Sequence, residues 1–262
     1  MSKSSRSLSR KVRNDRVFRA LLERKTMSVA DIQDLLGVSA MTARRCLDDL
    51  HHDGLARRIH GGATAVDPWG RQSVFQQRLL HRSEIKTALV GRALEHVPEN
   101  GSIFLDAGTT CLELAKQLNG RHGSGVIITD SIAAALEMRG KSNFKTILIG
   151  GEIGEDGNAI GGSLAADFVS NFSIDVLFFS ASAFNDQRLE NSVLTGTFIK
   201  KLLLPKAGKT VCIIDSVKYG RQRCFRVCGW EHVDVLITDT GLPHAARKSI
   251  QEQGVEIVLV GI

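Results

Sequence analysis

Two adjacent arginines and the hydroxyl group before them have the chemistry to contact the bases and phosphates of a nucleic acid. The guanidinium groups of Arg44 and Arg45 can each donate two parallel hydrogen bonds, for example to O6 and N7 of guanine. Thr42 lies two residues earlier, and threonine can contact a base or a phosphate. The candidate DNA-contacting residues, including flanking caps and a nearby basic segment, are Ser28, Ser39, Met41, Thr42, Arg44, Arg45, Arg57, Arg58, His60 and Gly61.

Two short helices joined by a tight turn are predicted to position these side chains. Ser28, with Asp31 three residues later, is a variant of the capping box that starts a helix. Gly37 provides the turn, where a positive φ is often needed, and Ser39 caps the second helix. Apolar residues at helical spacing give each helix a face for the core: Val29, Ile32, Leu35 and Leu36 in the first, and Ala43, Cys46, Leu47 and Leu50 in the second.

The buried stripe of the second helix leaves residues such as Met41 and Arg44 pointing away from the core. A short helix with hydroxyl and guanidinium groups outward near its N-terminus suits a recognition helix in the major groove. Residues 55–62 (LARRIHGG) form a basic extended segment that ends in a glycine turn, which we interpret as a wing. The alternative is an ordinary helical hairpin with a solvated basic face. The order of cap, glycine turn, second cap and basic hairpin favours DNA binding.

The excess positive charge lies in the first third of the chain. The protein has 262 residues, a formal net charge of +6 and a pI near 9.2. Residues 1–80 contain 15 Lys and Arg against 8 Asp and Glu, whereas residues 81–262 contain 19 against 20. The excess therefore coincides with the predicted helix-turn-helix, as expected for a DNA-binding domain, and the rest of the chain is not expected to touch DNA.

Composition and cysteine usage argue against several other classes of protein. With 43% apolar and 24% charged residues, the chain has an ordinary globular composition. No stretch approaches 18 apolar residues, and the polar N-terminus lacks the apolar segment of a signal peptide. The five cysteines lack the paired spacing of a zinc site: Cys46, Cys111, Cys212, Cys224 and Cys228. We therefore expect a cytoplasmic protein, nucleoid-associated when bound to DNA, with no metal, no other cofactor and no membrane partner.

Changes in sequence texture divide the chain into four parts. A breaker cluster at residues 67–70 (DPWG) marks a domain boundary, and short apolar runs begin to alternate with amphipathic segments from Glu84. The predicted parts are a disordered basic tail at 1–11, a winged helix-turn-helix domain at 12–67 with its first helix at 12–24, a linker at 68–83, and a second domain at 84–262.

The second domain is predicted to be an α/β domain with a mostly parallel sheet that helices cover on both faces. Its strands are near-continuous apolar runs, placed at 103–106, 126–129, 146–149, 174–180, 210–215, 234–238 and 255–260. Its helices fit between them at 84–97, 109–119, 130–139, 164–171, 195–204 and 242–253.

Small and polar residues follow the predicted strands, at the sheet edge where parallel sheets bind ligands. After the first strand, residues 106–110 (DAGTT) open a helix whose free N–H groups and hydroxyls suit phosphate. Asp106 and Asp215 can bind sugar hydroxyls, and Lys86 and Lys218 can hold a phosphate or a carboxylate. Each loop alone could equally be structural, since the same residue types cap helices and make turns. The candidate ligand-binding residues are Lys86, Asp106, Gly108, Thr109, Thr110, Thr129, Ser131, Gly150, Gly151, Asp215 and Lys218.

The sequence resembles the DeoR/GlpR family of bacterial regulators of sugar metabolism over nearly its full length. The segments that carry the resemblance are TARR at 42–45, RIHGGA at 58–63, DAGTT at 106–110, TDS at 129–131, GG at 150–151, DSVKYG at 215–220 and TD at 238–239. The resemblance implies a winged N-terminal domain and a C-terminal domain similar to ribose-5-phosphate isomerase, which senses a phosphorylated sugar. It also implies a repressor that acts as a dimer or higher oligomer.

Three departures from the family pattern stand out. Cys46 replaces the usual aspartate after the paired arginines and deepens the apolar stripe. Asp130 replaces the usual asparagine and puts an extra carboxylate near the expected anion site. The segment 179–199 lacks the glycine-rich loop and downstream glutamate that often line the effector site.

Three hypotheses for function remain open at this point. The first is a repressor of a carbohydrate operon that a phosphorylated sugar releases from its operator. The second is an isomerase-like enzyme with a DNA-binding head, for which Asp106, Asp215 or Glu190 would have to serve as a general base. The third is a DNA-binding protein whose second domain serves only for oligomerisation.

Overall fold

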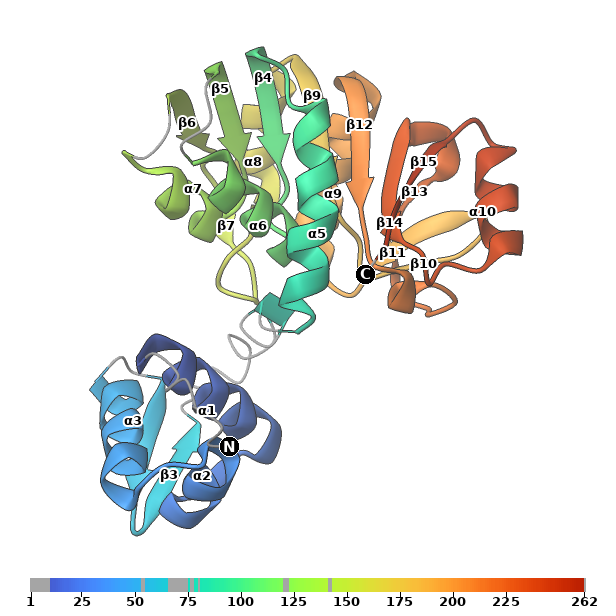
Figure 1. Ribbon diagram of the computed structural model, residues 1–262. Helices are drawn as coiled ribbons and strands as arrows, with labels where there is room; N and C mark the ends of the chain where they lie inside the picture. The colour runs from blue at the N-terminus through green and yellow to red at the C-terminus, as the bar shows by residue number, and fades with distance from the viewer. Residues whose placement is uncertain are drawn as a thin grey trace. The chain divides into compact units, whose positions relative to one another are not determined.

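The structure, a computed structural model, describes residues 10–52, 55–65, 75, 78–79, 81–119, 123–140 and 143–261, apart from the side chains of 11, 19, 22 and 23. The chain divides into two compact units between Leu80 and His81 (Figure 1). Most of the predicted tail, the breaker cluster at 67–70 and most of the predicted linker lie outside the described residues.

The N-terminal unit is a winged helix-turn-helix. Its elements are α1 (Arg10–Arg24), β1 (Thr26–Ser28), α2 (Val29–Leu36), α3 (Ala40–His52), β2 (Ala56–Ile59) and β3 (Gly62–Ala65). The three strands form an antiparallel sheet in the order β1-β3-β2. The predicted stripe of α3, which consists of Ala43, Cys46, Leu47 and Leu50, is fully buried against α1 and the sheet.

The predicted caps and turns of this unit are confirmed. The hydroxyl of Ser28 accepts a hydrogen bond from the Asp31 amide at 3.1 Å, and the Asp31 carboxylate accepts one from the Ser28 amide at 2.7 Å. Gly37 has the left-handed φ of 64° that ends α2. The Ser39 hydroxyl accepts from the Thr42 amide at 3.3 Å and so caps α3. These contacts hold the two helices at the turn.

The structure differs from the predicted N-terminal unit in two places. The described part of α1 already includes Arg10, two residues before the predicted start near Val12, and the Arg10 guanidinium bonds to Asp49 near the end of α3. Asn14 donates to the same carboxylate at 2.9 Å. Strand β1 was not predicted, because three residues are too few to show a periodic pattern.

All seven predicted strands of the C-terminal unit are present in one parallel sheet, which confirms the α/β class. They are β4 (Asn100–Leu105), β5 (Ser124–Thr129), β6 (Phe144–Leu148), β9 (Ile174–Phe179), β12 (Ala207–Ile213), β14 (Val235–Asp239) and β15 (Glu256–Val260). The strand order is β15-β14-β12-β9-β4-β5-β6 (Figure 1). Strands β9 and β4 are central neighbours, with Phe104 opposite Leu177.

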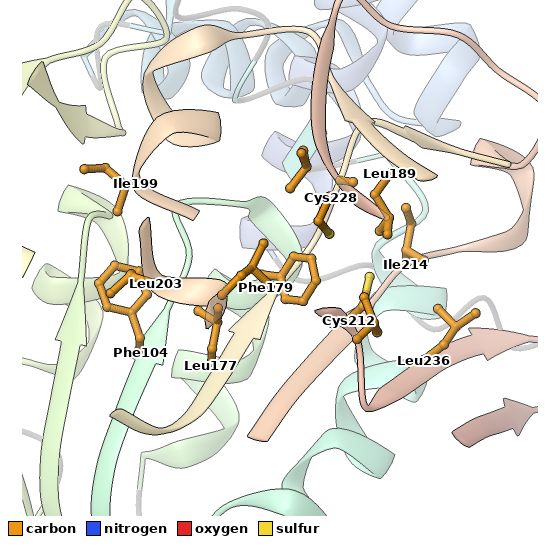
Figure 2. Close-up of a cluster of buried hydrophobic side chains, with 14 of the residues drawn as sticks. Phe104, Leu177, Phe179, Leu189, Ile199, Leu203, Cys212, Ile214, Cys228 and Leu236 are labelled. Carbon is orange, nitrogen blue, oxygen red and sulfur yellow. The ribbon is translucent and has the colours of Figure 1, made fainter. Parts of the chain in front are cut away.

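Helices cover both faces of this sheet, as predicted. They are α5 (Ser83–Ala93), α6 (Thr109–Leu118), α7 (Ile132–Met138), α8 (Gly162–Ser170), α9 (Leu194–Leu203) and α10 (His244–Gln251), with 3-10 turns η1 (Leu94–His96), η2 (Leu204–Lys206), η3 (Ser216–Lys218) and η4 (Trp230–His232). α5, α6 and α7 lie side by side over one face. α8, α9 and α10 pack on the other, against a cluster that includes Phe104, Leu177 and Phe179 (Figure 2).

Two small antiparallel sheets are separate from the parallel sheet and were not predicted. The hairpin of β7 (Glu152–Ile153) and β8 (Ile160–Gly161) precedes α8. The sheet of β10 (Ala183–Phe184), β11 (Arg188–Asn191) and β13 (Phe225–Gly229) follows β9. Phe184 anchors this second sheet, with its ring edge-on to Tyr219 at 5.5 Å and to Trp230 at 6.0 Å between centroids. Segment 179–199 is therefore ordered by tertiary packing.

Candidate functional site

The exposed face of α3 presents the side chains predicted to contact DNA. Met41 is 64% exposed, and Arg44 and Arg45 are exposed on the same side of the helix. Within the described part of the chain, neither guanidinium has a hydrogen-bond or ion-pair partner. Arg57 on β2 and His60 in the wing turn are also exposed. These groups are therefore available to an external partner.

Other predicted DNA contacts already have partners inside the N-terminal unit. The Arg58 guanidinium donates to the Gly62 carbonyl at 3.2 Å, and its Nε lies 3.3 Å from Oδ1 of Asp48 on α3. It thus ties the wing to the helix. Ser28 and Ser39 use their hydroxyls as caps, and Gly61 makes the wing turn with a φ of 73°. Contacts of these residues with DNA remain a prediction.

A buried ion pair stands at the carboxyl ends of β4 and β9 in the second unit. The Nζ of Lys200 lies 2.9 Å from Oδ1 and 3.0 Å from Oδ2 of Asp106. Lys200 also donates to the Ser180 carbonyl at 2.9 Å, and the Ser180 amide lies 3.3 Å from the Asp106 carboxylate. The ion pair therefore links β4, β9 and α9.

Lys200 is a residue that the sequence analysis missed. It lies on α9, on the same face as the buried residues Thr197, Ile199 and Leu203. A lysine on the buried stripe of an amphipathic helix requires a partner, since an unpaired buried charge is costly. Its position on the buried face of a predicted helix was the feature of the sequence that could have identified Lys200.

The N-terminus of α6 lies next to the Asp106 carboxylate. Gly108 precedes the helix and has no side chain with which to cap it, so the described structure gives the first amides of α6 no side-chain cap at this position. A Cβ at Gly108 would come within 3.1 Å of the Asp106 carboxylate and 3.6 Å of the Ser180 Cβ. Thr109 and Thr110 follow at the start of the helix and are buried. Helix N-termini of this kind favour anions.

At the end of β5, Thr129 and Ser131 make hydrogen bonds that hold the loops in place. Thr129 donates to the Leu105 carbonyl at 2.6 Å, and Ser131 caps α7 by accepting from the Ala134 amide at 3.1 Å. Asn158, which was not predicted, donates to the Ala107 carbonyl at 2.9 Å and to the Ser131 hydroxyl at 3.1 Å. Thr129 and Ser131 therefore shape the loops around the site.

Asp130 is fully buried, and neither of its carboxyl oxygens has a hydrogen-bond partner among the described residues. Burial, followed by the nearby Asp106 carboxylate, raises the pKa of Asp130 well above its ordinary value. The ammonium of Lys200 lowers the pKa by a smaller amount. The carboxyl group of Asp130 therefore keeps its proton to a higher pH in the folded protein than in the unfolded chain.

The ends of β12 and β14 contribute a second lysine and further unpaired oxygens. Lys218 donates to the Ala181 carbonyl at 2.9 Å, next to the carbonyl that Lys200 binds. Asp239 binds the amide and hydroxyl of Ser216 at 2.7 and 2.6 Å. The buried atoms Asp215 Oδ1 and Thr238 Oγ1, like the Ser180 hydroxyl, have no partner among the described residues.

The remaining predicted ligand-binding residues are Lys86, Gly150 and Gly151. Lys86 is buried on α5. Gly150 is exposed, and Gly151 stands where a Cβ would overlap the Gly161 carbonyl of the β7–β8 hairpin. The structure thus brings together Asp106, Gly108, Thr109 and Lys218 around Ser180 and Ala181, and gives Gly151 a packing role.

The described residues show neither a membrane-spanning helix nor a metal-binding cluster. No helix among them combines the length and apolarity required to cross a membrane. No group of three or more His, Cys, Asp or Glu side chains among them is arranged to hold a metal ion.

Comparison with known proteins identifies the family. Residues 13–68 match the DeoR-like helix-turn-helix domain, and residues 81–240 match the DeoR C terminal sensor domain. The chain is 32% identical over 250 residues to the HTH-type transcriptional regulator GlpR of Haloferax volcanii, with 94% of this chain and 96% of that one covered. It is 29% identical over 253 residues to the HTH-type transcriptional repressor CsqR of Escherichia coli, with 94% of each chain covered.

Among solved structures, ribose 5-phosphate isomerase A from Neisseria gonorrhoeae has a TM-score of 0.41 and 17% identity over 54% of this chain and 55% of that one. This likeness is too distant to bear on activity. The two domain matches together span both units, and they confirm the resemblance that the sequence motifs indicated. The chain belongs to the DeoR family of DNA-binding transcriptional regulators.

Proposed function

We propose that the protein represses a carbohydrate-utilisation operon and leaves its operator when a phosphorylated sugar binds the second unit. The repressor CsqR among its relatives supports the direction of control. The observation that carries the proposal is a set of buried oxygens on Asp130, Ser180, Asp215 and Thr238 that have no hydrogen-bond partner among the described residues. They lie at the ends of four parallel strands, at the sheet edge where α6 also begins.

These oxygens suit a polyhydroxyl ligand. Buried polar atoms in native proteins nearly always have hydrogen-bond partners, so a cluster of unpaired ones indicates that a ligand or water supplies them. Hydroxyl groups of a sugar can donate to the carboxylate of Asp215 and exchange hydrogen bonds with Ser180 and Thr238.

The phosphate group would bind at the start of α6. There the first amides of the helix meet no side-chain cap, and Thr109 and Thr110 carry hydroxyls. Lys218 supplies a positive charge from the end of β12, while Lys200 is already neutralised by Asp106. The site therefore combines groups that bind an anion, at the start of α6, with several hydrogen-bond acceptors, which is the pattern expected for a sugar phosphate.

Two of the carboxylates that could serve an isomerase as its general base, Asp106 and Glu190, are already engaged by other groups. An isomerase needs a free general base whose pKa lies near the working pH. Asp106 is held by Lys200, and Glu190 on β11 accepts from the Arg223 amide at 2.6 Å and from Arg188 at 2.6 Å. Those hydrogen bonds lower the pKa of Glu190 and make it a weaker base. In a regulator, the same contacts with the ligand would shift the equilibrium between the conformations of the protein.

In the head, we assign operator binding to the exposed face of α3 and to the wing. Arg44 and Arg45 are placed for base edges in the major groove, and Arg57 and His60 for phosphates. Because one such head covers one half-site, we expect a homo-oligomer on a palindromic operator.

A gel-shift titration with the gene's own upstream region tests this function. We expect a fragment of that region to bind more tightly than random DNA of equal length at physiological salt, and one sugar phosphate from a panel to release it. Inorganic phosphate and the unphosphorylated sugars serve as ligand controls. Equal binding to all fragments would refute the repressor, and a panel without effect on either DNA binding or melting temperature would refute the sensor.

A further inference from the structure

Helices α8 and α9 expose an apolar surface that no described residue covers. Five large side chains on it, between 37% and 67% exposed, form what we term the α8–α9 patch: Ile153, Leu164, Phe168, Leu194 and Phe198. α8 packs beside α9, and β7, which carries Ile153, packs beside α8. Large exposed apolar side chains grouped on neighbouring elements are typical of interaction sites in soluble proteins.

The two helices present matching outer stripes. On α8, Leu164 and Phe168 lie one turn apart, and exposed Asp167 adjoins both. On α9, Leu194 and Phe198 also lie one turn apart, and exposed Lys201 follows on the same face. Each stripe therefore has two large apolar residues and one charge, with opposite signs on the two helices.

This arrangement is self-complementary. In a two-fold interface the same surface is used by both partners, so a contact from α8 to the other α9 occurs twice. Such a pairing buries the apolar residues of both chains and brings each Asp167 to the other chain's Lys201. Within the described part of one chain, no ion pair joins these two side chains, so both charges are available.

We propose that the α8–α9 patch is the surface through which a second copy of this chain binds. The inference rests on the proposed function in one respect: a repressor needs two heads for two half-sites, which makes a second copy the expected occupant. An apolar centre bordered by complementary charges is also the usual composition of such an interface.

Sedimentation velocity of the full chain without DNA tests the proposal. We expect wild type to dimerise and Phe198→Asp to weaken association by about 30-fold or more, as for a buried aromatic at the centre of an interface. Leu136→Asp is the matched control, since Leu136 is 62% exposed on α7, away from α8 and α9. A monomeric wild type, unchanged association in Phe198→Asp, or loss of association in Leu136→Asp alone would overturn the proposal.

Charge reversal gives a second measurement that a folding defect cannot imitate. Asp167→Lys and Lys201→Asp should each weaken association at low salt, whereas the double variant should restore it because both pairs are re-formed in reverse. A double variant no better than the weaker single variant would contradict the pairing. Operator binding is measured separately by gel shift. If wild type did not bind DNA specifically, the proposed repressor function would be refuted, but the result on self-association would be unaffected.

Discussion

Lys200 Nζ lies 2.9 Å from Asp106 Oδ1, and the two side chains are only 6% and 2% exposed. They are 94 residues apart in the sequence and join the end of β4 to the middle of α9. Removing one member of a buried ion pair leaves the other charge without compensation, which costs more than the pair itself contributes.

Lys200→Met should therefore destabilise the C-terminal unit by about 3–5 kcal/mol. Urea denaturation would measure the loss, with Lys145→Met as the control because Lys145 is exposed on β6 of the same unit. Adding Asp106→Asn should recover part of it. If the two lysine variants were equally stable, the ion pair would have no structural weight.

Two adjacent glycines in the wing should respond differently to alanine. At Gly62 a Cβ would overlap the Met27 carbonyl of β1, so Gly62→Ala should separate β1 from β3 and cost at least ~2 kcal/mol. Gly61 has open space but a φ of 73°, so Gly61→Ala should cost only about 1 kcal/mol. The melting temperature of each full-length variant, compared with wild type, would rank the two substitutions. A larger loss for Gly61→Ala than for Gly62→Ala would contradict the β1–β3 contact.

Asp130 should make stability fall as the pH rises. Folding raises the pKa of Asp130 above its ordinary 3.8. As the pH rises, the unfolded chain therefore loses this proton at a lower pH than the folded protein does, and the unfolded state is stabilised relative to the folded state. Between the unfolded and folded pKa values, this term lowers the free energy of unfolding by ~1.4 kcal/mol per pH unit.

Asp130→Asn should accordingly be more stable than wild type at pH 8 and similar to it near pH 4. Denaturation at a series of pH values would measure the difference, with Glu99→Gln, at an exposed position of the same unit, as the control. Parallel profiles for wild type and Asp130→Asn would show that Asp130 is ionised in the fold.

Arg45→Ala should weaken operator binding by about 1–3 kcal/mol if Arg45 reads a base. Fluorescence anisotropy at fixed salt would compare the operator with random DNA, and exposed Arg139 on the second unit provides the control substitution Arg139→Ala. An equal loss on both DNAs would instead make Arg45 a phosphate contact.

Lys218→Ala should leave operator binding intact and abolish release by the sugar phosphate. The ammonium group is expected to bind the phosphate, and its bond to the Ala181 carbonyl positions it beside Ser180. Titration of the effector into a preformed DNA complex would measure the response, with Lys206→Ala as a control on the surface. Normal release from the variant would remove Lys218 from the site.

Much of the fold was predictable because it depends on local periodicity. The apolar spacing of α3 predicted its four buried residues, and all seven apolar runs of the second domain became strands of the parallel sheet. The short strands β1, β7, β8 and β10 were missed, since pieces of two or three residues carry no period and depend on their partners.

The candidate site was predictable only in part, for the same physical reason. Asp106, Gly108 and Lys218 follow strands, so the rule for parallel sheets located them from order alone. Lys200 and Asn158 lie within a helix and a hairpin loop, and only long-range contacts bring them to the site. Arg58 was predicted to contact DNA, yet its contacts with Asp48 and Gly62 depend on how the wing folds against α3.

The sequence by itself determined that a basic helix-turn-helix precedes an α/β domain with polar strand ends, because charge, caps and periodicity are local properties. Only the tertiary structure decided which polar groups are already satisfied and which are left for a ligand. That distinction depends on burial and on partners far along the chain, as the contrast between paired Asp106 and unpaired Asp130 demonstrates.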